Sequence, residues 1–438
     1  MTLRPQGGCE MKKIASIGNT EIYSVGNDKF KTNAIEVDFF DELSRERVYK
    51  NSLVLKVLSS GTENYPDQRA LERRYMELYG TNIQTDRAIV GDIQIMKFIL
   101  LYPEEKYIGT NDGLFEKGLD LLFEVIRKPR LENGAFVKSI FENEKNDHDD
   151  AIRASLNDKL DYALERLTEI SFEGEPYAVP QKGKVEDGIG LDEKILYDYY
   201  MNYFLKKMKV RIFCSCAGDV SMIEKIIREK GYYSTDECVK TDIGWHTYPK
   251  REPVIDVERF ESSQAKLVMS FKVDIEPESQ DSFAFDLGSD ILGGGFDSML
   301  NQTVREKSSL AYFIYSFYRQ TKGYMVIYCG IDEKNREKAE KLIFEQIERL
   351  KKGDFTNAQV ESAKNKKINR LISISDGQAS LVNYNSVNLI MGSRDTIDER
   401  IEKVKKITKK MIVSAAASVK HDATVFICGL EKKGDEAK

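Results

Sequence analysis

The sequence predicts an α+β protein made of two homologous domains, each with a mostly antiparallel sheet covered by helices on one face. Its 438 residues, 41% of them hydrophobic and 32% charged, indicate a globular chain too long for one ordinary core. Strand and helix patterns occur in groups and do not alternate strictly, which favours α+β over α/β. The order of these patterns in the first half of the chain also returns in the second half.

The first half contains alternating or apolar segments that predict strands and periodic segments that predict helices. Asp67 is typical of a helix start, Gly80 of a helix end, and Pro129 stops the helix before it. We expect strands at 14–25, 32–40, 82–90, 91–101 and 210–218. We expect helices at 49–60, 67–80, 112–127, 192–207 and 221–231, and one long helix or a helix pair at 136–170.

The second half repeats this order. Strands at 264–273, 323–330 and 423–430 correspond to the runs at 32–40, 91–100 and 210–219, and helices at 281–292 and 337–353 correspond to those at 49–60 and 112–127. The run 296–312 corresponds to 67–83. We therefore place a first domain at 12–233, a polar linker at 234–258 and a second domain at 259–433. Two unrelated α+β domains are the alternative explanation of the pattern.

Composition excludes several classes of function. The net charge of −6 and a pI of about 5.6 give no basic footprint for nucleic acid. The apolar runs are too short to span a membrane, and residues 1–10 do not resemble a signal peptide. The six cysteines are scattered, so disulfides are not expected, which fits a reducing compartment. We expect a cytoplasmic protein with no nucleic-acid or membrane partner.

The stretch 292–315, LGGGFDSMLNQTVREKSSLAYFIY, stands out as a candidate peptide-handling site. It opens with Gly293, Gly294 and Gly295, whose backbone can approach another chain closely. An amphipathic run from Phe296 to Val304 follows and fits one helix face. Arg305 and Tyr312, seven residues apart, can both donate hydrogen bonds to a carbonyl.

Residues 292–312 resemble the second-domain signature of the pitrilysin and mitochondrial-processing-peptidase family of zinc peptidases. The segments SSGTENYPDQRALERRYMELYG and EGEPYAVPQKGKVEDGIGLDEKILYDYYMNYF add to this resemblance, which covers residues 12–430. It implies two homologous domains that face one another across a chamber.

The zinc motif of that family is lost from this chain. Active members carry His-x-x-Glu-His on the first helix of the first domain, where two His bind zinc and the Glu activates water. The resemblance places the two His positions at Ser52 and Lys56 and the Glu at Leu55, and a third ligand near 149–151. Lys56 would repel a cation, so we expect neither a catalytic zinc nor a cofactor in this chain.

The three histidines offer no replacement set, because no two of them have the spacing of helix ligands. They are His148, His246 and His421. His148 lies among acidic residues, and we expect it to be a solvated helix residue.

The substrate-binding pair of the family is present. The resemblance implies that Arg305 and Tyr312 hold the substrate backbone near the scissile carbonyl, and that the triple glycine resembles the substrate-guiding loop of non-catalytic subunits. A purely structural interpretation is also open: Arg305 could cap a helix end, Tyr312 could fill core, and the glycines could form a plain helix-entry turn.

These features lead to one main hypothesis. The chain would be the non-catalytic, substrate-binding subunit of a heterodimeric bacterial zinc endopeptidase, and a homologous partner would supply the zinc and its ligands. The alternatives are a scaffold or chaperone-like relative without a proteolytic role, a homodimeric peptide-binding module, and an independent enzyme with another nucleophile, for which no Ser/His/Asp or Cys/His set is indicated.

Overall fold

The computed structural model describes residues 11–26, 29–216, 218–249, 251–260 and 264–430. The chain forms two compact units. Unit 1 comprises Met1–Arg153, Val179–Ile243 and Ile372–Asp398, and unit 2 comprises Ala154–Ala178, Gly244–Leu371 and Glu399–Lys438. Residues 1–10, and residues 431–433 at the end of the predicted second domain, lie outside the described residues.

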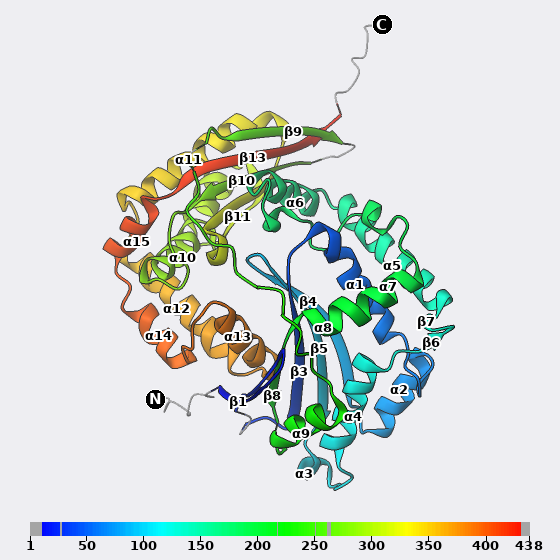
Figure 1. The fold of residues 1–438 in the computed structure, drawn as a ribbon. Coiled ribbons are helices and arrows are strands. Elements are labelled where there is room, and N and C mark those ends of the chain that lie inside the picture. Colours follow the sequence, from blue (N-terminus) through cyan, green and yellow to red (C-terminus); the bar gives the residue numbers. More distant parts are fainter. Residues whose placement is uncertain (1–10, 27–28, 217, 250, 261–263, 431–438) are drawn as a thin grey trace, which may run out of the picture. The chain divides into compact units, whose positions relative to one another are not determined.

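Unit 1 is built on a six-stranded sheet with the order β1-β2-β8-β3-β5-β4 (Figure 1). Its strands are β1 (Lys12–Ile17), β2 (Thr20–Ser24), β3 (Thr32–Glu42), β4 (Asn82–Val90), β5 (Ile93–Pro103) and β8 (Lys209–Ser215). All pairs are antiparallel except β2 with β8. One face buries Val37, Phe39, Phe98 and Leu100 against helices, and these residues belong to the main hydrophobic core of unit 1.

The helices of unit 1 begin and end close to the predicted signals. They are α1 (Arg45–Ser59), α2 (Gln68–Glu77), α3 (Glu105–Ile108), α4 (Leu114–Arg127), α5 (Lys138–Asn157), α7 (Glu193–Tyr199), α8 (Leu205–Lys207), α9 (Ser221–Lys230) and α13 (Gln378–Ile390). A π-helical turn, Tyr200–Phe204, joins α7 to α8, and a short hairpin of β6 (Leu131–Glu132) and β7 (Ala135–Phe136) follows α4. Asp67 caps α2 by accepting a hydrogen bond from the backbone N–H of Ala70.

Unit 2 is built on a five-stranded sheet with the order β11-β12-β10-β13-β9. Its strands are β9 (Val254–Phe260), β10 (Ala265–Lys272), β11 (Ala311–Arg319), β12 (Tyr324–Ile331) and β13 (Lys420–Gly429). Its helices are α6 (Lys159–Ser171), α10 (Gln280–Gly293), α11 (Arg336–Lys352), α12 (Asn357–Ile374), α14 (Ile397–Lys405) and α15 (Lys409–Ala416), with a π-helical segment at Asn301–Lys307.

The two sheets share one topology, which confirms the predicted fold class. Read from the β9 edge, the order β9-β13-β10-β12-β11 matches β2-β8-β3-β5-β4 strand for strand. In each sheet the only parallel pair is the equivalent one, β2 with β8 and β13 with β9, among the described residues. The corresponding helices α1 and α10 each follow the central strand of their sheet. The division into sequence domains at 12–233 and 259–433 stays a prediction.

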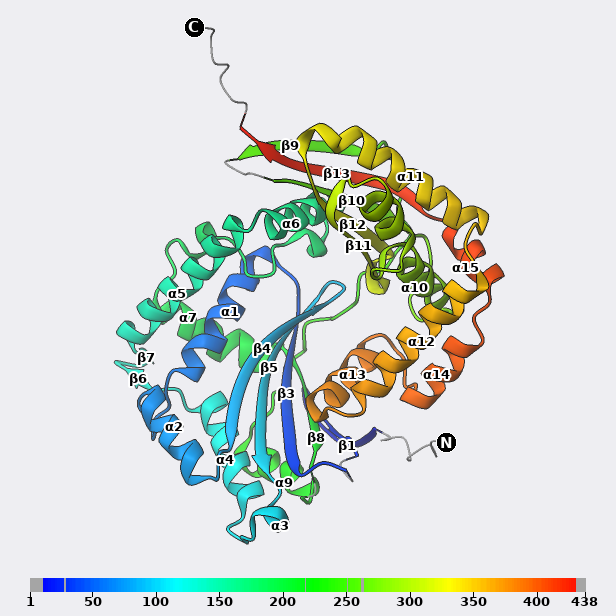
Figure 2. The ribbon, with the colours of Figure 1, turned by 180° about the vertical axis from the view of Figure 1, so that it is seen from behind.

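One further helix covers the second face of each sheet, the face away from the helices that follow its central strand. In each case this helix comes from the other half of the chain. Helix α6 packs on β10 and β13 of unit 2, and α13 packs on β3 and β8 of unit 1 (Figures 1 and 2). The predicted 136–170 segment is thus a helix pair whose members, α5 and α6, serve mainly different units. Strand β9 begins inside the segment expected to be a linker.

Candidate functional site

Helix α1 carries the three positions where the zinc motif is expected. Ser52 and Leu55 are buried, and Leu55 belongs to the main core. The Ser52 Oγ donates to the carbonyl oxygen of Val48 at 2.8 Å, one turn back along the helix. Lys56, half-buried, lies one turn after Ser52. A hydroxyl, an alkyl chain and an ammonium therefore stand where the motif requires two imidazoles and a carboxylate.

A guanidinium lies directly on this face of α1. The Arg87 Nη1 donates to the Ser52 Oγ and also, at 3.1 Å, to the carbonyl oxygen of Gln181. Arg87 comes from the edge strand β4, and burial lowers its pKa. The strand and the helix thus bring a second cationic side chain to the part of α1 that already carries Lys56.

His148 is buried, which corrects the expectation of a solvated helix residue. Only 1% of it is exposed, and its ring packs edge-on against Tyr49 with 4.8 Å between centroids. Its Nε2 lies 3.0 Å from the carbonyl oxygen of Lys182, so Nε2 carries the proton and donates. Burial, with Arg87 and Lys56 nearby, lowers the pKa of His148 to about 4. The acidic neighbours in sequence misled the prediction because His148 and the adjacent Asp149 both lie on the buried face of α5.

The chemistry of this site does not fit zinc. Asp149, in the region expected for the third ligand, instead accepts a hydrogen bond from the Tyr49 hydroxyl at 2.7 Å. Arg87 and Lys56 would repel a dication, and the Leu55 side chain has no ligand atom. Within the described ranges, no group of three or more His, Cys, Asp or Glu side chains is arranged to hold a metal.

His148 predicts a pH dependence of stability. The histidine is neutral in the folded protein down to about pH 4, whereas an unfolded histidine binds a proton below about pH 6.5. The contribution of the neutral His148 to the free energy of unfolding is therefore fully present above pH 6.5 and is lost as the pH falls toward 4. Single-site linkage gives a loss of about 2 kcal/mol between pH 7.5 and 4.5.

Urea unfolding at several pH values measures this effect. His148→Gln keeps a donor for the Lys182 carbonyl but does not titrate, so its stability should fall by about 2 kcal/mol less than that of the wild type over this range. His246→Gln is the matched control, because His246 is exposed, and it should keep the wild-type slope. An unchanged slope in the His148 variant would contradict the assignment.

The glycine stretch forms a tight turn between α10 and the π-helical segment. Gly293 ends α10, and a side chain there would lie 2.7 Å from the backbone nitrogen of Ser316 on β11. Asp297, just after the glycines, accepts a hydrogen bond from the Ser362 Oγ at 3.3 Å and pairs with Lys366, both on α12. Gly294 and Gly295 lie between these two anchors. The loop is therefore held at both ends.

The exposed Phe296 and the half-buried Arg305 form a pair beside this loop. Phe296 is 70% exposed, which corrects the prediction that it shares a buried helix face with Met299 and Val304. The reason is that the turn continues through Asp297, so the helix begins after Phe296. The Arg305 guanidinium lies 5.7 Å from the Phe296 ring centroid and 3.7 Å from the Glu306 Oε1. Its remaining N–H groups are able to donate to a ligand.

Tyr312 lies at the start of β11 and is 58% exposed, so it does not fill core. Its hydroxyl donates to the Asp332 Oδ1 at 2.9 Å, and this bond raises the pKa of Tyr312. Arg305 and Tyr312 therefore have different partners in the structure. To donate to a peptide carbonyl, the phenol would have to exchange its bond to Asp332.

Sequence reasoning missed Arg87, although a signal was present. In NIQTDRAIV, the half-buried residues Ile83, Thr85 and Arg87 alternate with exposed ones. The Thr85 hydroxyl lies 3.3 Å from the Ser59 hydroxyl on α1. Since alternate residues of a strand share a face, Arg87 also points toward α1.

The comparisons with known proteins agree with this geometry. The family described as "Peptidase M16 inactive domain" matches residues 196–367. A Bacillus subtilis protein named "Probable inactive metalloprotease YmfF" is 28% identical over 415 residues, which cover 94% of this chain and 97% of that protein. The chain is therefore similar to M16 metallopeptidases and to an inactive relative of them. This agrees with the resemblance to the pitrilysin and mitochondrial-processing-peptidase family seen in the sequence.

Other known proteins are similar to this chain in sequence or in fold. The "Uncharacterized zinc protease YmxG" of Bacillus subtilis is 23% identical over 288 residues, 64% of this chain and 68% of that protein. A conserved protein from Enterococcus faecalis has the same fold, with a TM-score of 0.91 at 24% identity, over 97% of this chain and 100% of the other. An M16 inactive-domain protein from Pseudomonas fluorescens gives a TM-score of 0.78 at 16% identity, over 97% and 99%.

In the parts that the structure describes, the chain contains no helix with the length and apolar character that crossing a bilayer requires.

Proposed function

We propose that this chain is the non-catalytic, substrate-binding subunit of a heterodimeric zinc metalloendopeptidase that processes or degrades peptides. A homologous partner supplies His-x-x-Glu-His, the zinc and the activated water. This chain supplies Arg305, Tyr312 and the glycine loop 293–295, and the pair acts in the cytoplasm on peptides or small unfolded chains.

The observation that carries the proposal is the contrast between two parts of the chain. At Ser52, Leu55 and Lys56, metal-binding chemistry is replaced by buried or cationic side chains, and Arg87 covers the face of α1. At 293–312, by contrast, the donors Arg305 and Tyr312 are accessible. The matches to an inactive M16 domain and to a probable inactive metalloprotease support the same division.

The chemistry of the second region suits a peptide. Two N–H or O–H donors hold backbone carbonyls by hydrogen bonds, and donors placed where negative charge develops also favour the transition state. The exposed Phe296 ring beside Arg305 offers an apolar contact for a substrate side chain.

Mixing experiments test the proposal. The chain should be purified with and without an M16 partner that carries His-x-x-Glu-His, encoded beside it, and assayed on a library of fluorogenic peptides. We expect cleavage by the pair, little by either chain alone, and zinc in the partner only. Stoichiometric tight zinc in this chain, or full activity of the partner alone, would contradict the proposal.

A scaffold or chaperone-like relative is the second candidate. The intact sheets and cores of both units would serve such a role without the Arg305 and Tyr312 donors. A stable complex with the partner whose cleavage rate is the same with and without this chain would favour it.

A further inference from the structure

Two positive side chains meet on helix α1 of unit 1, where the zinc ligands are expected. The Arg87 Nη1, from β4, donates to the Ser52 Oγ on this helix. Lys56 lies one turn after Ser52, and residues four apart on a helix share a face. Both cations are close enough to His148 to lower its pKa. Arg87 and Lys56 therefore belong to one surface of unit 1.

The Arg87 guanidinium is held in place and keeps one edge open. Its Nη1 donates to the Ser52 Oγ and, at 3.1 Å, to the carbonyl oxygen of Gln181. Ser52 is itself fixed, because its Oγ donates to the carbonyl oxygen of Val48 at 2.8 Å. Within the described ranges nothing accepts a hydrogen bond from the Arg87 Nε or Nη2, and neither atom is fully buried. These two N–H groups form the edge with which a guanidinium binds two oxygens of one oxyanion.

Lys56 also lacks a counter-ion. Its side chain is half-buried, and in the part of the chain that the structure describes its Nζ forms no ion pair or hydrogen bond. Asp86, the neighbour of Arg87 in β4, is exposed, and strand alternation directs it to the opposite face of the sheet. Neither cation therefore has a carboxylate bound to it.

The carboxylates that α5 brings to this side of α1 are held by hydroxyl groups. Asp149 accepts a hydrogen bond from the Tyr49 hydroxyl at 2.7 Å. Glu144 accepts one from the Ser60 hydroxyl at 2.6 Å. Both acids are thus bound to other donors, and the open edge of the guanidinium is left to a ligand.

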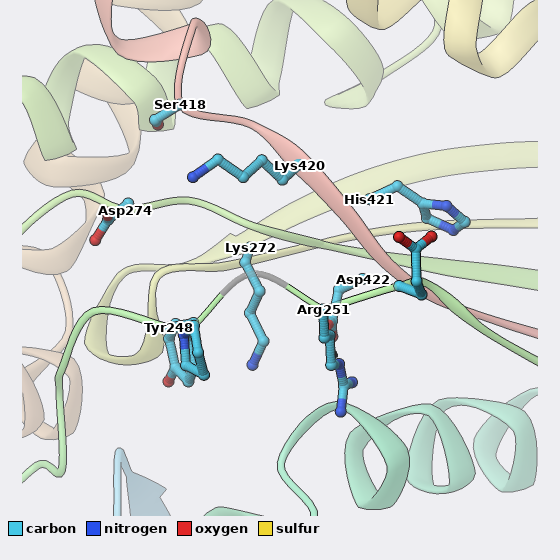
Figure 3. Close-up of a pocket in the computed structure, with 10 residues that line it drawn as sticks. Tyr248, Arg251, Lys272, Asp274, Ser418, Lys420, His421 and Asp422 are labelled. Atoms are coloured by element: carbon cyan, nitrogen blue, oxygen red, sulfur yellow. Dashed lines mark hydrogen bonds and ion pairs between the residues drawn. The ribbon is translucent and has the colours of Figure 1, made fainter.

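Other arginines show the usual way in which this edge is satisfied. In a cavity of about 510 Å³ in unit 2, the Arg251 Nε donates to the Asp422 Oδ1 at 2.8 Å (Figure 3). The Arg251 Nη2 donates to the carbonyl oxygen of Ile170 at 3.0 Å. On α1, the Arg47 Nε lies 2.9 Å from a carboxylate oxygen of the buried Asp41. Arg87 differs from both, because its Nε and Nη2 have no acceptor in the described protein.

We propose that Arg87 and Lys56 form a binding site for an oxyanion, which is either free phosphate or the terminal carboxylate of a peptide. The Arg87 Nε and Nη2 each donate to one oxygen, and the Lys56 ammonium supplies a further charge-assisted donor. A partly buried charge without a counter-ion is costly, and a bound anion removes that cost.

The replacement of the zinc ligands thus inverts the preference of this surface from a cation to an anion. Two fixed positive charges stand where the family places a dication. The site lies in unit 1 and uses neither Arg305 nor Tyr312, so it is independent of the proposed peptidase role.

Titration calorimetry on the full-length wild-type chain tests the proposal. The probes are inorganic phosphate, the dipeptide acetyl-Ala-Ala with a free carboxylate, and the same dipeptide as its C-terminal amide, each in low-chloride buffer at pH 7.5. We expect saturable binding of at least one anion with a Kd on the order of 1 mM, because only a few charge-assisted hydrogen bonds form at a partly solvated site.

The probes also distinguish the two sources of the anion. Phosphate binding without dipeptide binding identifies a small-anion site, and the reverse identifies a site for peptide termini. Failure of both anions to bind, or saturable binding of the amide with the Kd of the acid, would overturn the proposal.

Three variants locate the bound anion. Arg87→Lys keeps the charge but loses the paired N–H groups, and we expect it to raise Kd by about tenfold. Lys56→Gln removes an amine without a protein partner, so the fold stays intact, and Kd should rise by about fivefold. Lys50→Gln is the matched control on α1, where the Lys50 Nζ lies 5.4 Å from the Tyr199 ring centroid, and Kd should change by less than about twofold. Equal Kd values for Lys56→Gln and the wild type would contradict the site.

Discussion

Replacing Arg305 by Ala and Tyr312 by Phe together should lower kcat/KM for peptide cleavage by the zinc-bearing pair by about 100-fold or more. Loss of a single donor to a developing oxyanion typically lowers the rate by about 10²-fold to 10³-fold. Both side chains are accessible, and the Tyr312→Phe change removes only the hydroxyl that now binds Asp332. Steady-state kinetics with a fluorogenic peptide measure the change.

A matched control removes the same two kinds of donor from β11, the strand that carries Tyr312. The control combines Tyr315→Phe with Arg319→Ala, both on β11. The Tyr315 ring packs against Tyr328, and the Arg319 guanidinium lies over the Phe317 ring. We expect this control to change kcat/KM less than about threefold, and we expect both double variants to bind the partner as the wild type does. Equal kcat/KM values for the Arg305/Tyr312 double variant and the wild type would contradict the substrate-binding role of this pair.

Replacing Lys97 by Met should destabilise unit 1 by about 3–5 kcal/mol, because it leaves two buried carboxylates without their counter-ion. The Lys97 Nζ lies 2.5 Å from the Glu36 Oε1 and 3.7 Å from the Asp38 Oδ2, and all three residues are buried. The group also holds α13, since Lys97 donates to Asn383 at 3.3 Å and Ser386 donates to Asp38 at 2.9 Å. Urea unfolding measures the loss, and limited proteolysis reports on α13.

The loss of stability caused by Lys97→Met should be smaller at low pH. Burial and the neighbouring Glu36 hold the pKa of Asp38 well above its usual value in the wild type. A carboxyl with a raised pKa favours the folded state at low pH, and this contribution is lost as pH rises through the folded pKa. The Lys97→Met deficit should therefore be smaller at pH 5 than at pH 8.

Two further variants make the Lys97 result specific. Glu36→Gln added to Lys97→Met should recover part of the stability, because one buried charge is removed. Lys225→Met on α9 breaks an exposed pair with Glu229 and should cost less than about 0.5 kcal/mol. If Lys97→Met lowered the free energy of unfolding as little as Lys225→Met does, the result would contradict a stabilising role for the buried Lys97 ion pair.

The repeat, the fold class and most elements could be predicted because they depend on local signals. The alternating character of residues 82–90 predicts β4 with the bounds that the structure shows, and Asp67 marks the N-cap of α2. The correspondence of 264–273 with 32–40 predicts equivalent central strands, which β10 and β3 are. Even the loss of zinc chemistry follows from residue identity alone, since Leu55 and Lys56 offer no motif ligand.

Other features depend on which distant segments meet, and no local pattern encodes that. Phe296 has the spacing of a buried helix residue, but the tie between Asp297 and α12 keeps it in the turn. His148 has acidic neighbours in sequence, but the fold places it against Tyr49 of α1.

The sequence by itself determined that this chain is a two-fold repeat of one α+β design, with a candidate donor pair in one copy and no zinc ligands in the other. Only the tertiary structure decided that α6 and α13 cross to the sheet of the other half. The physical reason is that an amphipathic helix buries its apolar face equally well on any complementary surface. Its own residues therefore do not specify the sheet on which it packs. The Lys97 cluster lies beneath α13, and it could not be read from the sequence.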